Sequence, residues 1–150
     1  MSTYTQILYQ IVFGSKDYTS FLNVHNQGQL FGYIAGILNN RNCHSYQVGG
    51  YENHIHIVTH ISPIVNLADI VRDIKRATHE FMVKEKSSYH CFPGWQVGYG
   101  AFTYHISMKS TLINYVLNQE HHHRKETFKE ELLRLLDENQ VSYKEEYLII

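Results

Sequence analysis

The chain of 150 residues has few of the features that mark a secreted or membrane protein. It has only two cysteines, Cys43 and Cys91, whose spacing matches no zinc pattern and requires no disulfide. No apolar run is long enough to span a bilayer, and the first residues lack the basic start and apolar block of a secretory signal. We therefore expect a cytoplasmic protein.

A strong net charge and a nucleotide-binding loop are also absent. The formal net charge of −1 argues against a protein that coats nucleic acid by bulk attraction, although it leaves room for local basic patches. The chain has no Gly-x-x-x-x-Gly-Lys loop, so we expect no nucleotide cofactor. Hydrophobic residues make up 43% of the chain, enough for a packed core, and no repeat or linker divides it. A single domain over residues 1–150 is the expectation.

The segment from Glu52 to Ile61 has the pattern of a β-strand, because polar residues alternate with apolar residues that are mostly β-branched. Side chains alternate between the faces of a strand, so His54, His56 and His60 share one face. His54 and His56 can offer ring nitrogens to one divalent cation, whereas His60 lies ~13 Å beyond His56 and is too far away. Two ligands are too few, so a third must come from elsewhere in the chain. The plain alternative is a polar, solvated sheet face.

The rest of the chain predicts strands and helices in the order β-α-β-β-α-β, followed by two further helices. This order is typical of the α+β ferredoxin-like fold, an antiparallel sheet with helices on one face. Its first and third strands are central, so the isoleucines beside the histidines should face the helices. The histidines should face the other side, where the C-terminal helices can lie. The expected strands cover residues 4–13, 43–48, 52–61 and 95–106, with Gly49 and Gly50 as a hairpin turn. Two helices are expected over residues 27–40 and 66–84. A third helix, capped by Ser107 or Ser110, should carry Tyr115 and Gln119. The last helix should begin at a capping box formed by Thr127 and Glu130.

Tyr115 and Gln119 are four residues apart in the first of the C-terminal helices. Residues with this spacing share a helix face, with ~5–6 Å between them, so the phenol and the carboxamide should point to the same place. Gln119 can then complete an oxygen-containing metal site on the histidine strand, and Tyr115 can present its hydroxyl beside it. The tail from Val141 to Ile150 ends in apolar residues and should dock on an apolar surface.

The combination of a strand His54-Ile55-His56 and a helical Tyr115-x-x-x-Gln119 resembles the HUH single-tyrosine transposases, the small IS200-like enzymes that move single-stranded insertion sequences. Residues 95–102 resemble the strand that precedes the tyrosine helix in that family. The C-terminal segment that ends in Tyr147-Leu148-Ile149 is also similar. The resemblance covers nearly the whole chain.

The resemblance implies a DNA transposase that acts on single-stranded DNA. Tyr115 would attack a phosphodiester to give a 5′-phosphotyrosine and a free 3′-hydroxyl, which can later rejoin strands. His54, His56 and Gln119 would hold Mg²⁺ or Mn²⁺. The resemblance further implies DNA hairpins at the element ends as the partner, and a homodimer in which the tyrosine helix of one subunit can complete the site of the other. It leaves the general base unassigned.

Several basic and polar side chains are candidates for contacts with DNA. The run His121-His122-His123 is expected to be a solvated helix end or a DNA-facing surface rather than a metal site. Two alternatives remain open: a domesticated relative that cleaves DNA without moving its own element, and a non-catalytic module that binds single-stranded nucleic acid through Tyr99, Phe102 and Tyr104. The candidate phosphate contacts are Arg41, Lys75, Arg76, Lys109, Arg124 and Lys125.

Overall fold

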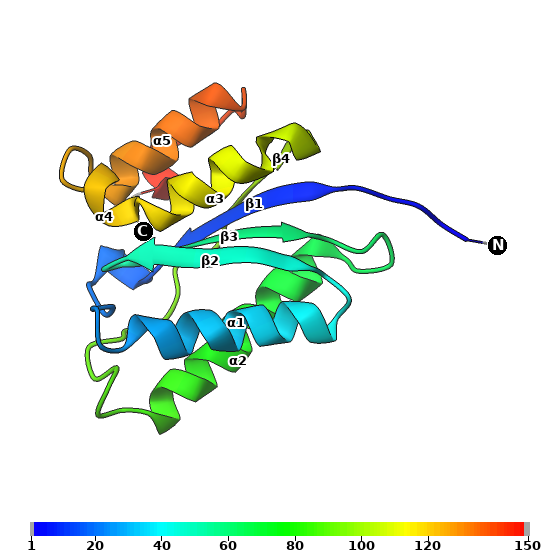
Figure 1. The fold of residues 1–150 in the computed structure, drawn as a ribbon. Helices are drawn as coiled ribbons and strands as arrows, with labels where there is room; N and C mark the ends of the chain where they lie inside the picture. Colours follow the sequence, from blue (N-terminus) through cyan, green and yellow to red (C-terminus); the bar gives the residue numbers. More distant parts are fainter. Residues whose placement is uncertain (1, 149–150) are drawn as a thin grey trace.

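The protein is built on a four-stranded antiparallel sheet with the strand order β2-β3-β1-β4 (Figure 1). The computed structural model describes residues 2–148. β1 pairs with both β3 and β4, so the first and third strands are central, as predicted. The strands are β1 (Leu8–Gly14), β2 (Ser45–Tyr51), β3 (His54–His60) and β4 (Gly100–Tyr104).

One face of the sheet is covered by α1 (Gln27–Asn40) and α2 (Leu67–Lys84) (Figure 1). Ile55 and Ile57 of β3 lie in the core on this face, which confirms the predicted direction of the isoleucines. α1 has the predicted bounds. α2 begins where Asn66 accepts a hydrogen bond from the Asp69 backbone N–H at 3.1 Å, a normal N-cap.

The other face is covered by α3 (Lys109–Leu117), α4 (Gln119–His122) and α5 (Phe128–Glu138), as Figure 1 shows. α5 opens with the predicted capping box of Thr127 and Glu130. Its apolar side chains pack on Val12 of β1 and Phe102 of β4. Three short 3₁₀ segments complete the described chain: Lys16–Tyr18, Ile106–Met108 and Glu145–Leu148.

The predicted hairpin turn was wrong. Gly49 and Gly50 lie inside β2, and the turn to β3 is made by Glu52 and Asn53, with Glu52 at a φ of 53°. A Cβ on Gly50 would lie 2.1 Å from the carbonyl oxygen of His54, so this glycine allows a close backbone approach rather than a turn. The pairing of β2 with β3 continues through both glycines, which lie opposite His56 and Ile55.

Three other boundaries differ from prediction. β1 begins at Leu8, and β4 is confined to Gly100–Tyr104, with only a single bridge between Ser15 and Trp95 before it. Neither predicted serine caps α3, whose N-cap, Met108, makes no side-chain cap bond. Leu148 packs on the cluster beneath α5, while Ile149 and Ile150 of the predicted docking tail lie outside the described residues. Across residues 2–148, no helix combines the length and apolar character needed to cross a membrane.

Candidate active site

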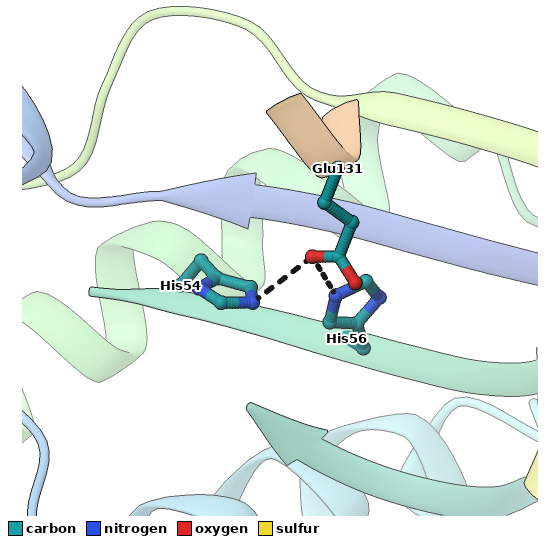
Figure 2. A group of neighbouring side chains, drawn as sticks. All are labelled: His54, His56 and Glu131. Carbon is teal, nitrogen blue, oxygen red and sulfur yellow. Dashed lines mark hydrogen bonds and ion pairs between the residues drawn. The ribbon is translucent and has the colours of Figure 1, made fainter. Parts of the chain in front are cut away.

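Two histidines of β3 and one carboxylate of α5 meet beneath the C-terminal helices. His54, His56 and Glu131 are fully buried, and Figure 2 shows the carboxylate reaching down to both rings. Glu131 Oε1 lies 3.3 Å from His54 Nε2 and 3.0 Å from His56 Nε2. The three residues can present one ligand atom each, all within 4.8 Å of one another. The histidines thus face the C-terminal helices, as predicted.

Glu131 was missed by the sequence reasoning. It lies three residues after Phe128 and four before Leu135, on the buried side of α5. A carboxylate is rare at a position that packs into a core unless it is paired. A glutamate among the apolar positions of this helix was therefore the feature of the sequence that could have identified it as a site residue. Only the packing of α5 on the sheet identifies its histidine partners on β3, because they are 75 residues or more away in sequence.

Gln119 reaches the same cluster, although not from the helix that carries Tyr115. α3 ends at Leu117, Asn118 leaves the helical conformation (φ −99°, ψ 23°), and α4 begins at Gln119. Gln119 Oε1 lies 2.9 Å from His54 Nε2, and its amide nitrogen donates to Glu131 Oε2 at 3.0 Å. The structure therefore brings the predicted residues together, while the expectation of one continuous helix face was wrong.

The hydrogen bonds around His54 determine which of its ring nitrogens is protonated. The amide nitrogen of Asn53 donates to the Tyr18 carbonyl at 3.1 Å, so its side-chain oxygen faces His54 Nδ1 at 2.9 Å. Nδ1 must then carry the proton, and Nε2 presents a lone pair. Burial lowers the pKa of His54 to about 4, so the ring is neutral at pH 7.

The lone pair of His54 Nε2 points at two oxygens that are also electron-pair donors. Gln119 Oε1 lies 2.9 Å away and Glu131 Oε1 lies 3.3 Å away. The orientation of the Gln119 amide is determined by its donation to Glu131, so its oxygen cannot be exchanged for the nitrogen without losing that bond. Three acceptors that face one another without a proton between them would be stabilised by a cation. Imidazole nitrogens with a carboxylate and an amide oxygen are a donor set that fits a divalent metal ion.

Glu131 also connects this cluster to the candidate nucleophile. Burial raises the pKa of Glu131, but the charge of His56 and the hydrogen bonds with His123 and His56 outweigh it and hold that pKa well below its usual range. The carboxylate is therefore charged. Its Oε2 accepts the hydrogen bond of the Tyr115 hydroxyl.

The Tyr115 hydroxyl has a second charged neighbour. Arg134 Nη2 donates to the phenol oxygen at 2.6 Å, and the guanidinium is held by Glu126 at 2.7 Å and Glu138 at 3.1 Å. Burial, with the nearby charge of Glu131, raises the pKa of Tyr115 despite Arg134, so the phenol carries its proton in this state. A surface cavity of about 440 Å³ opens beside it, lined by Tyr115, His121, His122, Lys125, Glu126 and Arg134.

The three consecutive histidines have different environments. His121 is exposed, as predicted, whereas His122 stacks on the Tyr115 ring with 4.5 Å between centroids. The prediction of a solvated side chain was wrong for His123, whose side chain is 5% exposed and whose Nε2 lies 3.0 Å from Glu131 Oε1. His60 is outside the cluster, as expected, since its Nδ1 accepts a hydrogen bond from the Ile7 backbone at 3.1 Å.

Three of the basic DNA candidates lie with α1 and α2, across the sheet from the cluster. Arg41 pairs with Asp73 at 2.9 Å. Lys75 donates to the carbonyls of Gln96 and Gly98, and burial lowers its pKa to about 8. Arg76 borders an open cavity next to Trp95. Contacts between these residues and DNA stay a prediction.

The other three basic candidates lie with the C-terminal helices. Lys109 sits over the ring of Tyr46, 5.2 Å from its centroid. Arg124 makes an exposed pair with Glu120 at 3.7 Å. Lys125 borders the cavity beside Tyr115 and is the candidate nearest to the proposed chemistry.

A model of a known protein family matches most of the chain. The family model described as "Transposase IS200 like" matches residues 3–119. The chain belongs to the IS200-like transposase family. The matched segment includes both histidines of β3, Tyr115 and Gln119, and it ends before α5. Glu131 and Arg134 therefore lie outside the part of this transposase that the family model describes.

Solved structures share the fold of this IS200-like transposase at low sequence identity. A protein of Deinococcus radiodurans R1, described as a candidate transposase, is 15% identical with a TM-score of 0.63, over 79% of this chain and 95% of its own. A REP-associated tyrosine transposase bound to a REP hairpin is 14% identical with a TM-score of 0.55, over 82% of this chain and 74% of its own. No curated protein matches the sequence.

Proposed function

We propose that this transposase cleaves and rejoins single-stranded DNA, with Tyr115 as the nucleophile. One observation carries the proposal: the phenol of Tyr115 and the imidazoles of His54 and His56 contact opposite oxygens of the same carboxylate, Glu131. A nucleophile and a candidate metal site are thereby held next to each other. This is the arrangement that attack on a metal-polarised phosphate requires.

In the proposed reaction, the Tyr115 oxygen forms a bond to phosphorus and the bond from phosphorus to the 3′-oxygen breaks. The phenol loses its proton, and the departing 3′-oxygen gains one. The products are a 5′-phosphotyrosine and a free 3′-hydroxyl. A 3′-hydroxyl can later attack the phosphotyrosine and rejoin strands, so the covalent intermediate retains the bond energy and no nucleotide cofactor is needed.

The side chains around Tyr115 have separate roles in this proposal. Arg134 lies within hydrogen-bond distance of the phenol oxygen and stabilises the negative charge that develops when the proton leaves. Glu131 orients the phenol, because a carboxylate with a strongly lowered pKa stays ionised to accept the hydrogen bond and is a weak base. A divalent ion, Mg²⁺ or Mn²⁺, held by His54, His56 and oxygens of Glu131 or Gln119, would polarise the scissile phosphate.

The proposed partner is single-stranded DNA that carries hairpins at the ends of a mobile element. The likeness to a transposase bound to a REP hairpin supports this choice of DNA. Lys125 is positioned for a phosphate at the mouth of the Tyr115 cavity. We also propose a homodimer, although within one chain Tyr115 already reaches its own Glu131.

A binding module without catalysis is less consistent with the fold. That alternative needs an open sheet face on which bases can stack on aromatic side chains. Phe102, one of the aromatic residues considered for it, is 4% exposed and packs under α5. The sheet face that carries it is therefore occupied by the protein's own helix.

A covalent-trapping experiment tests the proposal. Wild-type protein and Tyr115→Phe are mixed with end-labelled single-stranded DNA from the flanks of the gene, with Mn²⁺ or Mg²⁺, and separated on a denaturing gel. We expect a protein-linked label in the wild type that is lost in the variant, because only the phenol oxygen can form the phosphodiester link.

Tyr33→Phe is the matched control, since Tyr33 lies on α1, across the sheet from the cavity, and its ring stacks on Phe81. An adduct that persists in Tyr115→Phe would assign the nucleophile elsewhere. Binding of the hairpin strands without any adduct in the wild type would favour the non-catalytic module.

A further inference from the structure

His123 is the residue of the cluster that neither the Tyr-x-x-x-Gln pattern nor the proposed reaction uses. It comes from a run of three histidines, and it alone turns its ring into the interior, next to the ring of His54 at 4.5 Å between centroids. Its Nε2 lies 3.0 Å from Glu131 Oε1 and 3.1 Å from Gln119 Oε1. It lies at residue 123, outside the segment that the family model matches.

Three imidazole nitrogens surround one carboxylate oxygen. The Nε2 atoms of His54, His56 and His123 lie 3.3, 3.0 and 3.0 Å from Glu131 Oε1. Donor atoms bound to a common ion at ~2.1 Å stand ~3–4 Å apart, so each of these imidazoles is at the separation from the carboxylate that shared ligation produces. The group whose ligand atoms all lie within 4.8 Å of one another comprises His54, His56 and Glu131 and forms the base of such a site. His123, at the end of α4, is not in that group and contacts it through Glu131 Oε1, so it would join as a ligand by a turn of its ring when the ion binds.

The nature of these donors decides which ion they prefer. Mg²⁺ favours oxygen ligands and keeps much of its water, whereas imidazole nitrogen is a good ligand for divalent transition metals. A set with two imidazoles and two oxygens serves both kinds of ion. A third imidazole adds little for Mg²⁺ and much for a transition metal.

We propose that His123 is a metal ligand that, together with His54, His56 and Glu131, forms a centre of three imidazoles and one carboxylate selective for a divalent transition-metal ion over Mg²⁺. The inference rests on the proposed function in one respect, that His54, His56 and Glu131 hold a divalent ion. It goes further in assigning a ligand from the histidine run and a preferred class of metal. Neither depends on the identity of the nucleophile.

Binding of Co²⁺ to the full-length, DNA-free protein tests the inference without reference to activity. Affinity and stoichiometry come from calorimetry, and the visible absorption of bound Co²⁺ reports its ligands. We expect one tightly bound Co²⁺ in the wild type, resistant to a large excess of Mg²⁺. His123→Ala should weaken Co²⁺ binding at least ~10-fold and change the spectrum, an effect at the level of other losses in metal shells.

Two further variants make the result decisive. His121→Ala is the matched control for adventitious binding to the histidine run, because His121 is exposed on the same short helix, and it should bind Co²⁺ as the wild type does. His123→Gln keeps a donor for the hydrogen bond to Glu131 but supplies a poor ligand for Co²⁺. His123→Gln should lose Co²⁺ affinity as His123→Ala does. If the alanine variant fails to fold, the glutamine variant alone tests whether His123 is a ligand.

Wild-type affinity in His123→Gln would show that His123 only orients Glu131, which overturns the ligand assignment. Unchanged affinity in both His123 variants overturns it as well, and Mg²⁺ binding as tight as Co²⁺ overturns the selectivity. Failure of the Tyr115 adduct would refute the proposed reaction while leaving all these binding outcomes intact. A wild type that binds no divalent ion would refute both the inference and the metal part of the proposed function.

Discussion

At the scale of single residues, the carboxylate of Glu131 joins the candidate metal site to the candidate nucleophile. One of its oxygens contacts imidazoles, and the other accepts hydrogen bonds from the Tyr115 hydroxyl and the Gln119 amide. A fully buried, charged carboxylate is costly unless it is paired, and here imidazoles, a phenol and an amide hold it charged. The unfavourable contact of the metal-free site is the lone pair of His54 Nε2 against the oxygens of Gln119 and Glu131, which a bound cation would relieve.

The buried state of His54 makes the stability of the metal-free protein depend on pH. The pKa of His54 is about 4 in the folded chain, against an ordinary value of 6.5 that applies to the unfolded chain. Between these values the unfolded chain binds more protons, so stability falls as the pH is lowered from about 6.5 towards 4. The full difference corresponds to about 3 kcal/mol. Urea unfolding in the presence of a chelator, repeated across this pH range, measures the slope.

His54→Asn is the informative comparison for this slope, because it removes the titrating ring. We expect the variant to be less stable at pH 7 and its stability to change less between pH 6.5 and 4. The quantity compared is the slope rather than the level of stability, so a general loss of packing does not obscure the result. Equal slopes in the two proteins would show that His54 is not the group that destabilises the fold in acid.

At the scale of elements, the sequence predicted most of the sheet and about half of the site. The apolar periods gave α1 its bounds, which depend on local spacing alone, and the order of the elements placed β3 in the centre of the sheet. His54, His56, Tyr115 and Gln119 came from a motif with short spacings. Glu131, His123 and Asn53 could not be found this way, because their roles depend on how α5 and the β2–β3 turn pack on distant elements.

The glycine pair in β2 is a second feature that local sequence patterns could not predict. Gly49 and Gly50 have the composition of a turn, but Gly49 lies where α3 crosses the sheet. A Cβ on Gly49 would lie 2.6 Å from Val116 Cγ1 and 3.1 Å from the Val116 carbonyl oxygen. The missing side chain lets α3, and with it Tyr115, lie directly on β2. This is a contact between elements that no two-residue pattern reveals.

Gly49→Ala should therefore push α3 off the sheet. We expect a loss of ~1–3 kcal/mol in the free energy of unfolding, as for other overpacked sites, together with less Tyr115 adduct. Gly36→Ala is the matched control in α1, where an added Cβ meets nothing within 4 Å and should stabilise the helix by ~0.5–1 kcal/mol. Val116→Ala combined with Gly49→Ala should recover part of the loss. A stable Gly49→Ala protein with full adduct yield would show that α3 is not seated by this contact.

On the scale of the whole molecule, α5 closes the second face of the sheet and completes the site at once. Its buried side packs on Val12 and Phe102 and also supplies Glu131, and Arg134 of the same helix reaches the Tyr115 hydroxyl. The family model stops at residue 119, so its match does not include this helix. Core packing and site assembly should therefore be lost together when α5 is removed.

Two truncated chains separate these effects from the role of the tail. A chain of residues 1–126 lacks α5 and loses four buried apolar side chains, each of which contributes ~1.5–3 kcal/mol to the free energy of unfolding. Their total is comparable with the ~5–15 kcal/mol by which a domain is stable. The lost side chains are those of Phe128, Leu132, Leu135 and Leu136. We expect this chain to unfold without a cooperative transition, to bind a dye specific for exposed apolar surface, and to lose Co²⁺ binding.

A chain of residues 1–140 keeps α5 and removes only the segment around Leu148, so it should retain cooperative thermal unfolding and Co²⁺ binding with a lower Tm. Light scattering on this chain and on the full chain tests the proposed homodimer without disturbing the core. A 1–126 chain that melts cooperatively and binds Co²⁺ like the full chain would mean that Glu131 is not needed and that residues before α5 complete the site of His54 and His56. His123 and Gln119 are then the two to test, since both are retained and Gln119 already lies 2.9 Å from His54 Nε2.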